Sequence, residues 1–200
     1  MNLPFNYIKN LFGLHQSEDS GPILEFHPIL PTKFEFRQSP NFRRPLKPRS
    51  IKYIIIHATE SSFDLALHMF EDPKTEKSSH YLLDKFGNLV QLVEETDIAW
   101  HAGVSKWNGD NEINSKSIGI ELANLNNGID PYPLIQSRVL MYLVLTLCQK
   151  YRVSIDHILR HSDISGPKIR PKEPKVDPKG FPWEKFKREI SILLSQIYPS

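Results

Sequence analysis

An apolar run at residues 51–57 reads Ile-Lys-Tyr-Ile-Ile-Ile-His and carries one charged residue, Lys52. Four of its first six residues are β-branched, and the run is too short for a stable lone helix. The pattern therefore predicts a strand buried on both faces. His57 would then end the strand, at the edge where open α/β sheets bind their ligands. Taken alone, this stretch favours a structural histidine bonded to a neighbouring loop over a functional one.

Further strands and helices are predicted downstream. A turn at Gly87 between two short apolar runs is typical of a hairpin, and apolar residues three and four apart indicate helices. The expected elements are a helix at 63–72, a hairpin at 78–93, a strand at 117–124, a helix at 133–151 with Pro133 in its first turn, a short strand ending at 160, and a helix at 183–198. Residues 165–182 would form a long proline-rich loop.

The first 50 residues lack such a pattern. Prolines at positions 4, 22, 28, 31, 40, 45 and 48 exclude long regular elements, because each proline fixes φ and lacks a donor. Apolar side chains favour an extended arm packed on the core over a disordered tail: Ile23, Leu24, Phe26, Phe34 and Phe36. We therefore predict an α/β fold, with a central mixed β-sheet flanked by helices in residues 51–200 and an irregular, proline-rich N-terminal arm in residues 1–50.

Composition is that of an ordinary globular protein. The formal net charge of +2 is too small to indicate a nucleic-acid partner. Cys148 is the single cysteine, so an internal disulfide is excluded, and its apolar surroundings predict a core position. No segment reaches the about 20 apolar residues of a membrane span, and residues 1–15 do not match a secretory or lipoprotein signal. A basic cluster is expected to be a solvated face: Arg43, Arg44, Lys47, Arg49 and Lys52.

Candidate metal-site chemistry comes from two histidines and the last loop. His57 and His161 each follow a predicted strand, and an aspartate of the loop would add an oxygen ligand. Two nitrogens and one oxygen, with a fourth position open for water, are the composition of a catalytic zinc site. Spacing alone does not select these residues from eight histidines and many carboxylates. Glu121 lies inside an apolar strand, where a carboxylate is costly unless it works in a site or forms a salt bridge to a nearby lysine.

Six blocks together carry a family resemblance. They are residues 54–57 (Ile-Ile-Ile-His), 78–81 (Ser-Ser-His-Tyr), 99–105 (Ala-Trp-His-Ala-Gly-Val-Ser), 117–122 (Ser-Ile-Gly-Ile-Glu-Leu), 161–164 (His-Ser-Asp-Ile) and 175–178 (Lys-Val-Asp-Pro). In this order the chain resembles the zinc-dependent N-acetylmuramoyl-L-alanine amidases of the AmpD-like (type 2) family, which share a fold with peptidoglycan recognition proteins. The resemblance covers about residues 51–183 and leaves the N-terminal arm outside.

The resemblance implies a role for each matching residue. His57, His161 and Asp177 would be the metal ligands, Glu121 the general base, and Lys175 the cation that faces the reacting carbonyl. Phage members of the wider family have a cysteine as third ligand and a tyrosine before the histidine of the second block. Asp177 and Ser79 stand at those positions here, which leaves Glu121 as the best candidate base. Asp163 is a rival third ligand, although its place two residues after His161 also suits a loop cap.

The implied activity is hydrolysis of the amide bond between N-acetylmuramic acid and L-alanine. Zinc would lower the pKa of its water to about 7 and polarise the carbonyl. Glu121 would carry the proton to the leaving nitrogen, and Lys175 would stabilise the developing negative charge. Trp100 and His101, with Asn124 as a weaker candidate, would contact the substrate. Core packing is the alternative for Trp100.

Two other classes of function compete with an enzyme. They are a non-catalytic peptidoglycan-binding module and a zinc-free structural domain, and the complete ligand set favours the enzyme. We expect a bacterial monomer that acts on peptidoglycan or on muropeptides, in the cytoplasm or the periplasm, without a nucleic-acid partner or a membrane span. The second block and the proline-rich arm favour an envelope member of the family, while the lack of a leader favours a cytoplasmic recycling member.

Overall fold

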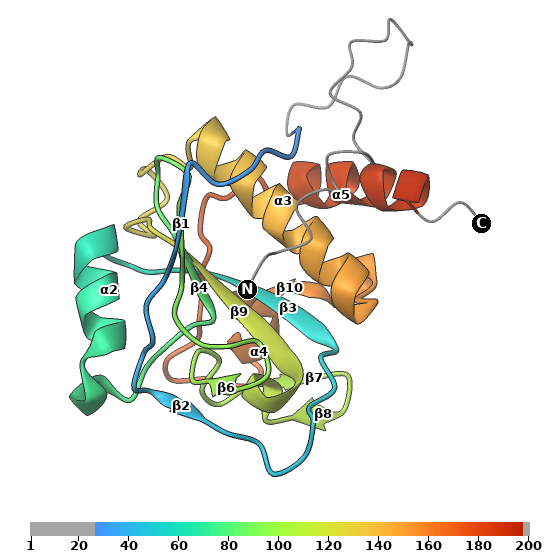
Figure 1. The fold of residues 1–200 in the computed structure, drawn as a ribbon. Helices are drawn as coiled ribbons and strands as arrows, with labels where there is room; N and C mark the ends of the chain where they lie inside the picture. The colour runs from blue at the N-terminus through green and yellow to red at the C-terminus, as the bar shows by residue number, and fades with distance from the viewer. Residues whose placement is uncertain (1–26, 198–200) are drawn as a thin grey trace, which may run out of the picture.

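A six-stranded mixed β-sheet forms the centre of the computed structural model, which describes residues 27–197 (Figure 1). Its strand order is β1-β5-β4-β9-β3-β10. β4 and β5 pair antiparallel, and the other neighbours pair parallel. The strands are β1 (Lys33–Phe36), β3 (Tyr53–Ala58), β4 (Tyr81–Leu83), β5 (Asn88–Gln91), β9 (Ser117–Leu122) and β10 (Ile158–Arg160). The predicted hairpin and the strands at 51–57 and 117–124 are confirmed, and Gly87 closes the hairpin with φ +83°.

Two long helices, α3 (Leu134–Tyr151) and α5 (Trp183–Ile197), cover one face of the sheet (Figure 1). Ile54 and Ile56 of β3 pack in the same buried cluster as Leu140 of α3 and Phe186 of α5. Cys148 is buried there, as predicted. The two helices are where the sequence placed them, except that Pro133 is the N-cap of α3 rather than part of its first turn.

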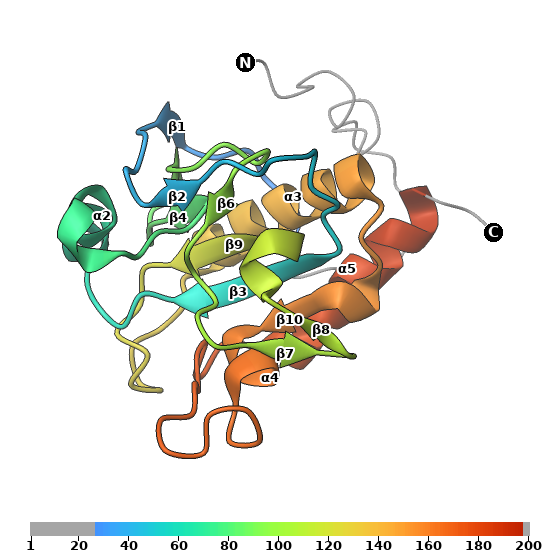
Figure 2. The same ribbon diagram turned by 90° about the horizontal axis from the view of Figure 1, so that it is seen from below.

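Shorter elements cover the opposite face. α2 (Phe63–Glu71) packs Phe70 against Leu82 and Val90 of the sheet. α4 (His161–Ser165) packs Ile164 against Ile55 of β3, on the side away from α3 and α5 (Figure 2). Side chains alternate along a strand, so odd-numbered residues of β3 face this shallower layer and even-numbered ones face the long helices. The predicted α/β fold with flanking helices is confirmed.

Several small elements complete the described chain. They are β2 (Phe42–Arg43), which pairs antiparallel with β6 (Ile98–Ala99), β7 (Lys106–Trp107), which pairs antiparallel with β8 (Asp110–Asn111), and the 3-10 turns η1 (Pro73–Thr75), η2 (Ile113–Lys116) and η3 (Ile155–His157). The sequence pattern did not predict the strands among them, because two-residue strands carry no periodicity. None of the helices formed by residues 27–197 combines the length and the apolarity that crossing a bilayer requires.

The part of the N-terminal arm that is described lies along the sheet. β1 forms its edge by pairing with β5, and β2 adds a second contact through β6. Phe34 and Phe36 are 42% and 45% exposed, so backbone pairing rather than burial of these rings attaches this segment. Ile23, Leu24 and Phe26 lie outside the described residues. The boundary at residue 50 stays a prediction.

Arg49 departs from the expectation of a solvated basic face. Its guanidinium donates to the carbonyl oxygens of Asp97 and Ser117, and burial lowers its pKa to about 10. The neighbouring Arg43, Arg44 and Lys47 are exposed, as expected. Arg49 therefore fastens the end of the arm to β9, a role that a run of basic residues does not reveal.

Ile54 provides a test of the core. Its side chain is 0% exposed, so Ile54→Ala should lower the free energy of unfolding by about 2–5 kcal/mol, and Ile54→Val by about 0.5–1.5 kcal/mol. Leu46→Ala is the control, because Leu46 is 104% exposed and its loss should change stability by less than about 0.5 kcal/mol. Urea unfolding of the three variants measures the differences, and equal costs at both positions would contradict the described packing.

Candidate active site

Parallel pairing brings three strand ends to one edge of the sheet. β3 pairs with β9 so that His57 lies beside Glu121, and with β10 so that Ile56 lies beside Arg160. His161 follows Arg160 directly, as the first residue of α4. Because Ile56 faces the long helices, His57 and Glu121 point to the opposite face. Strand pairing therefore brings His57 and His161, which are more than one hundred positions apart in the sequence, to the same edge of the sheet.

His57, His161 and Asp177 form a buried group that could hold a metal ion, with one ligand atom of each within 4.8 Å of the others. Asp177 Oδ2 lies 3.2 Å from His161 Nδ1 and 3.5 Å from His57 Nδ1. His57 Nδ1 is buried and has no hydrogen-bond partner among the described residues. A buried nitrogen without a partner, facing a carboxylate, is a fitting ligand for a cation. The structure thus brings together the three predicted ligands, and their role stays a prediction.

Backbone groups hold this group in place. The carbonyl oxygen of Ala102 lies 3.3 Å from His161 Nε2, and the backbone N–H of Ala58 donates to Asp177 Oδ2 at 3.4 Å. The backbone N–H of Ser162 donates to the carbonyl oxygen of Asp177 at 3.1 Å. The predicted loop before α5 contains no helix or strand between residues 166 and 182, and these contacts fix its functional end.

Asp163, the rival third ligand, caps α4. Its carboxylate accepts from the backbone N–H of Arg160 at 2.8 Å and pairs with the Arg160 guanidinium at 2.8 Å. These bonds engage the carboxylate within its own turn, and Asp163 is not part of the buried group. The position of Asp163 thus matches the alternative that the sequence left open, in which this residue is a loop cap and not a metal ligand.

Burial governs the protonation of the group. Burial lowers the pKa of His57 to about 4, and His161 adds to the effect. Burial would raise the pKa of Asp177, but the close approach of the His161 and His57 imidazoles outweighs it and holds that pKa below its usual value. At neutral pH the group therefore presents an unprotonated His57 imidazole and an ionised carboxylate, which are the forms that bind metals.

Glu121 is a buried carboxylate next to this group. It is 9% exposed, and its Oε2 has no hydrogen-bond partner among the described residues. The salt bridge to a lysine that the sequence left open is absent from the ion pairs of residues 27–197. Burial, and then repulsion from Asp177, raises the pKa of Glu121 well above its usual value. A carboxylate with a raised pKa holds a proton more readily, as a group that accepts and returns a proton must.

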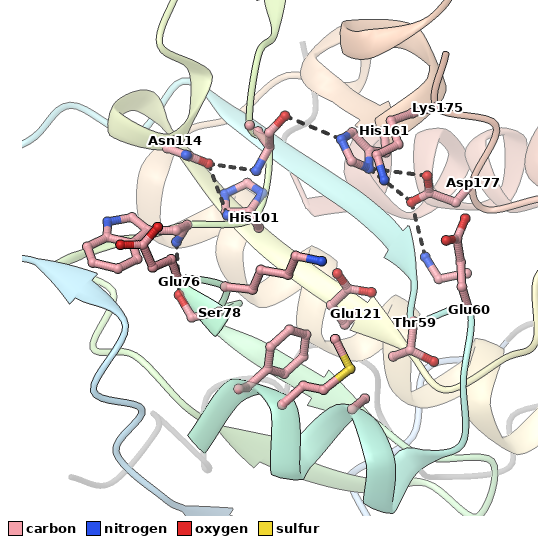
Figure 3. Close-up of a pocket in the computed structure, with 18 of the residues that line it drawn as sticks. Thr59, Glu60, Glu76, Ser78, His101, Asn114, Glu121, His161, Lys175 and Asp177 are labelled. Carbon is pink, nitrogen blue, oxygen red and sulfur yellow. Dashed lines mark hydrogen bonds and ion pairs between the residues drawn. The ribbon is translucent and has the colours of Figure 1, made fainter. Parts of the chain in front are cut away.

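A cavity of about 340 Å³ opens over these side chains (Figure 3). Lys175, His161 and Asp177 lie together on one side of it, and Glu121 faces it from β9. Trp100 and His101 also line the cavity, as their predicted contact with a substrate requires. The lining of the cavity offers both signs of charge, which suits a substrate with amide and carboxylate groups.

Asn124 is placed differently. Its side chain is 1% exposed, and its Nδ2 donates to the carbonyl oxygens of Asp130 and Pro131 at 3.0 and 3.3 Å. Its Oδ1 accepts from the backbone N–H of Asn126 at 2.8 Å. Asn124 is not among the residues that line the cavity. Its amide shapes the loop after β9, and its role toward a substrate stays a prediction.

The sequence pattern did not identify the other residues that line the cavity. Met69 and Phe70 of α2 form an apolar wall, and charged or amide residues from loops and from η2 complete the rim: Glu60, Glu76, Lys77, Asn114 and Arg170. Single polar residues in loops carry no pattern that distinguishes them from solvated ones. For α2 a signal existed, because this helix is the next element along the chain after the strand that carries His57.

Comparisons with known proteins identify the relatives of this chain. The family described as N-acetylmuramoyl-L-alanine amidase matches residues 47–179, a range that contains every predicted site residue. The N-acetylmuramoyl-L-alanine amidase AmiD of Escherichia coli is 32% identical over 154 residues, which are 70% of this chain and 53% of AmiD. The 1,6-anhydro-N-acetylmuramyl-L-alanine amidase AmpD of Haemophilus influenzae is 31% identical over 169 residues, which are 74% of this chain and 88% of AmpD.

A solved structure supports the same grouping. The complex of E. coli AmiD with anhydro-N-acetylmuramic acid-L-Ala-D-γ-Glu-L-Lys superimposes with a TM-score of 0.61 at 32% identity, covering 72% of this chain and 59% of that one. The chain thus spans about half of the length of AmiD and most of the length of AmpD. These relatives come from bacteria.

The lowered pKa of His57 predicts how the stability of the metal-free protein depends on pH. Between about pH 6.5 and 4 the unfolded chain binds a proton at His57 that the folded protein does not bind. The free energy of unfolding should therefore rise with pH across this window and fall on acidification. Urea unfolding in the presence of a chelator measures it, and His57→Phe should reduce the slope. If the free energy of unfolding depends on pH with the same slope in the unaltered protein and in the variant, the lowered pKa of His57 is contradicted.

Proposed function

Because the chain belongs to the N-acetylmuramoyl-L-alanine amidase family, we propose that it hydrolyses the amide bond between N-acetylmuramic acid, or its anhydro form, and L-alanine in muropeptides or peptidoglycan. The observation that carries the proposal is the buried group of His57, His161 and Asp177 beside Glu121, at the base of one cavity. A metal site and a proton acceptor within one cavity are what amide hydrolysis needs.

We propose zinc as the cofactor, held by His57, His161 and Asp177. The donors are two nitrogens and one oxygen, which leaves a fourth position for water or substrate. The unpartnered Nδ1 of His57 and the ionised Asp177 support this assignment. When bound, zinc supplies the Lewis acidity that activates water and polarises the carbonyl of the scissile amide.

Glu121 is the proposed general base. Its Oε2 has no partner within the described chain, so it is free to take a proton from the attacking water. The raised pKa of Glu121 makes the protonated form accessible, and the same oxygen can then deliver the proton to the departing nitrogen of L-alanine. Without this delivery the amine would be a poor leaving group.

Lys175 is the proposed electrostatic partner of the carbonyl oxygen. Its backbone N–H donates to the carbonyl oxygen of Ser165 at 3.0 Å, and its side chain lines the cavity beside Asp177. As the carbonyl oxygen gains negative charge, an ammonium group fixed in this position stabilises it more than it stabilises the neutral amide.

Substrate contacts and assembly complete the proposal. Trp100 offers an aromatic surface at the cavity, while Asn124 would act through the loop that it orders. The proposed residues all belong to one chain, so a monomer suffices. The resemblance covers both cytoplasmic recycling members and envelope members of the family, and the proposal therefore covers the cytoplasm and the periplasm. Anhydro-muropeptides are the first substrate to test, since the AmiD complex contains one.

Glu121→Gln should lower kcat/KM for peptide release from an anhydro-muropeptide by about 10²- to 10⁴-fold, because the amide cannot accept a proton. Zinc binding should persist, since Glu121 is not a ligand. Chromatography of the released peptide measures the rate, and Glu184→Gln at an exposed position of α5 is the control. If the zinc-loaded unaltered protein binds the substrate without cleaving it, the chain is a peptidoglycan-binding module instead.

Lys175→Met should lower kcat by about 10²- to 10³-fold with a smaller change in KM, because the charge acts mainly in the transition state. The matched control is Lys172→Met, which removes an exposed lysine of the same loop. Steady-state kinetics on anhydro-muropeptides and on whole sacculi give both parameters and the preferred substrate. Equal activity of the two variants would remove Lys175 from the mechanism.

A further inference from the structure

His101 lies behind His57 and has both of its ring nitrogens engaged. Its Nδ1 lies 2.9 Å from His57 Nε2, and its Nε2 lies 3.1 Å from Ser117 Oγ. The ring is 8% exposed and meets the His57 ring edge to face, with centroids 5.0 Å apart. Asn114 Oδ1 fixes the backbone here, because it accepts from the N–H groups of His101 and Ala102 (Figure 3).

The directions of these hydrogen bonds follow from Ser117. Its hydroxyl donates to the carbonyl oxygen of Ile113 at 2.7 Å, and a hydroxyl has one proton to give. Ser117 Oγ must therefore accept from His101 Nε2, which carries a proton. A neutral imidazole carries one proton, so His101 Nδ1 is an acceptor and His57 Nε2 is the donor. His57 Nδ1 is then left without a proton, on the side of Asp177.

The surroundings of His101 keep the ring neutral. The ring is buried beside the rings of His57 and His80, and no ion pair within residues 27–197 joins it to a carboxylate that could neutralise an imidazolium. A second proton on this ring would reverse the bond to His57 and put a proton on His57 Nδ1.

Gly119 makes room for the ring. A Cβ atom at this position of β9 would lie 2.4 Å from His101 Cγ, closer than atoms in contact can approach. The backbone N–H of Gly119 donates to Nδ1 of His80 at 3.0 Å, which fixes the next strand as well. A glycine in the middle of a buried strand is costly, and here it permits close packing of a side chain on the sheet.

We propose that His101 and Ser117 are positioning residues, which hold His57 in the tautomer protonated at Nε2 and so leave Nδ1 free to bind the metal ion. This inference rests on the metal site of the proposed function. It gives His101 a role other than direct recognition of substrate, because neither ring nitrogen is available to a ligand in the cavity. Partners of this kind typically change metal affinity about 10- to 100-fold.

Nuclear magnetic resonance of the metal-free protein tests the tautomer directly. Long-range ¹H–¹⁵N correlation of ¹⁵N-histidine-labelled protein at neutral pH should show His57 and His101 both protonated at Nε2. Ser117→Ala should convert His57 to a mixture of tautomers, because the variant lacks the hydroxyl oxygen that accepts from His101 Nε2 and so sets the direction of the hydrogen bond between His101 and His57. Ser137→Ala, which removes a buried hydroxyl of α3 that has no partner among the described residues, should leave the tautomers unchanged. A His57 protonated at Nδ1 in the unaltered protein would overturn the inference.

Zinc affinity supplies a second readout that is independent of activity. Competition with a chromophoric chelator should show binding weakened about 10- to 100-fold in His101→Phe, which keeps the ring but offers no acceptor. His101→Asn, whose Oδ1 can accept near the position of Nδ1, should recover part of the loss. Gly119→Ala should weaken binding by displacing the ring. Zinc affinity unchanged in both His101 variants would overturn the inference. If the unaltered protein binds no zinc, the proposed function is wrong, and the tautomer of His57 alone then decides the inference about His101.

Discussion

Parallel pairing of β9, β3 and β10 sets the side chains of the candidate site at one edge of the sheet. The register of β3 with β9 places His57 next to Glu121, and the register with β10 delivers His161 at the start of α4. A shift of one residue in any of these strands would turn the site residue toward α3 and α5. The apolar packing of Ile54 and Ile56 on those helices therefore fixes the geometry of the polar face.

Polar atoms buried without a partner are costly, and three of those in the described residues belong to the candidate site: His57 Nδ1, Glu121 Oε2 and Asp177 Oδ1. His57 Nδ1 and Glu121 Oε2 both lack hydrogen-bond partners within the described residues. Behind His57, by contrast, His101 Nε2 is bonded to Ser117 Oγ, and Ser117 Oγ donates to the carbonyl oxygen of Ile113. Such unpaired atoms in a native structure are typical of a binding or catalytic role. The same burial lowers the pKa of His57 and raises the pKa of Glu121, so that the neutral forms of both side chains are favoured.

Sequence reasoning reached the fold because its main elements have strong patterns. The Ile-rich strand ending in His57 and the hairpin at Gly87 follow from periodicity and turn chemistry alone, and the family resemblance brought His161 and Asp177 to the same site. Arg49 and Asn124 were harder to interpret, because whether a polar side chain faces water or a backbone carbonyl depends on tertiary contacts that no local pattern encodes. The pairing of His101 with Ser117 was invisible for the same reason, since it depends on which side of β9 the ring packs.

The central claim is that one metal ion is shared by side chains from three distant parts of the chain. Anomalous diffraction at the zinc absorption edge, from crystals of the zinc-loaded protein, tests it most directly. The account predicts a single strong peak about 2.0–2.2 Å from an imidazole nitrogen of His57, an imidazole nitrogen of His161 and the carboxylate of Asp177. A peak elsewhere, or a zinc-loaded crystal without a peak between these residues, would contradict it.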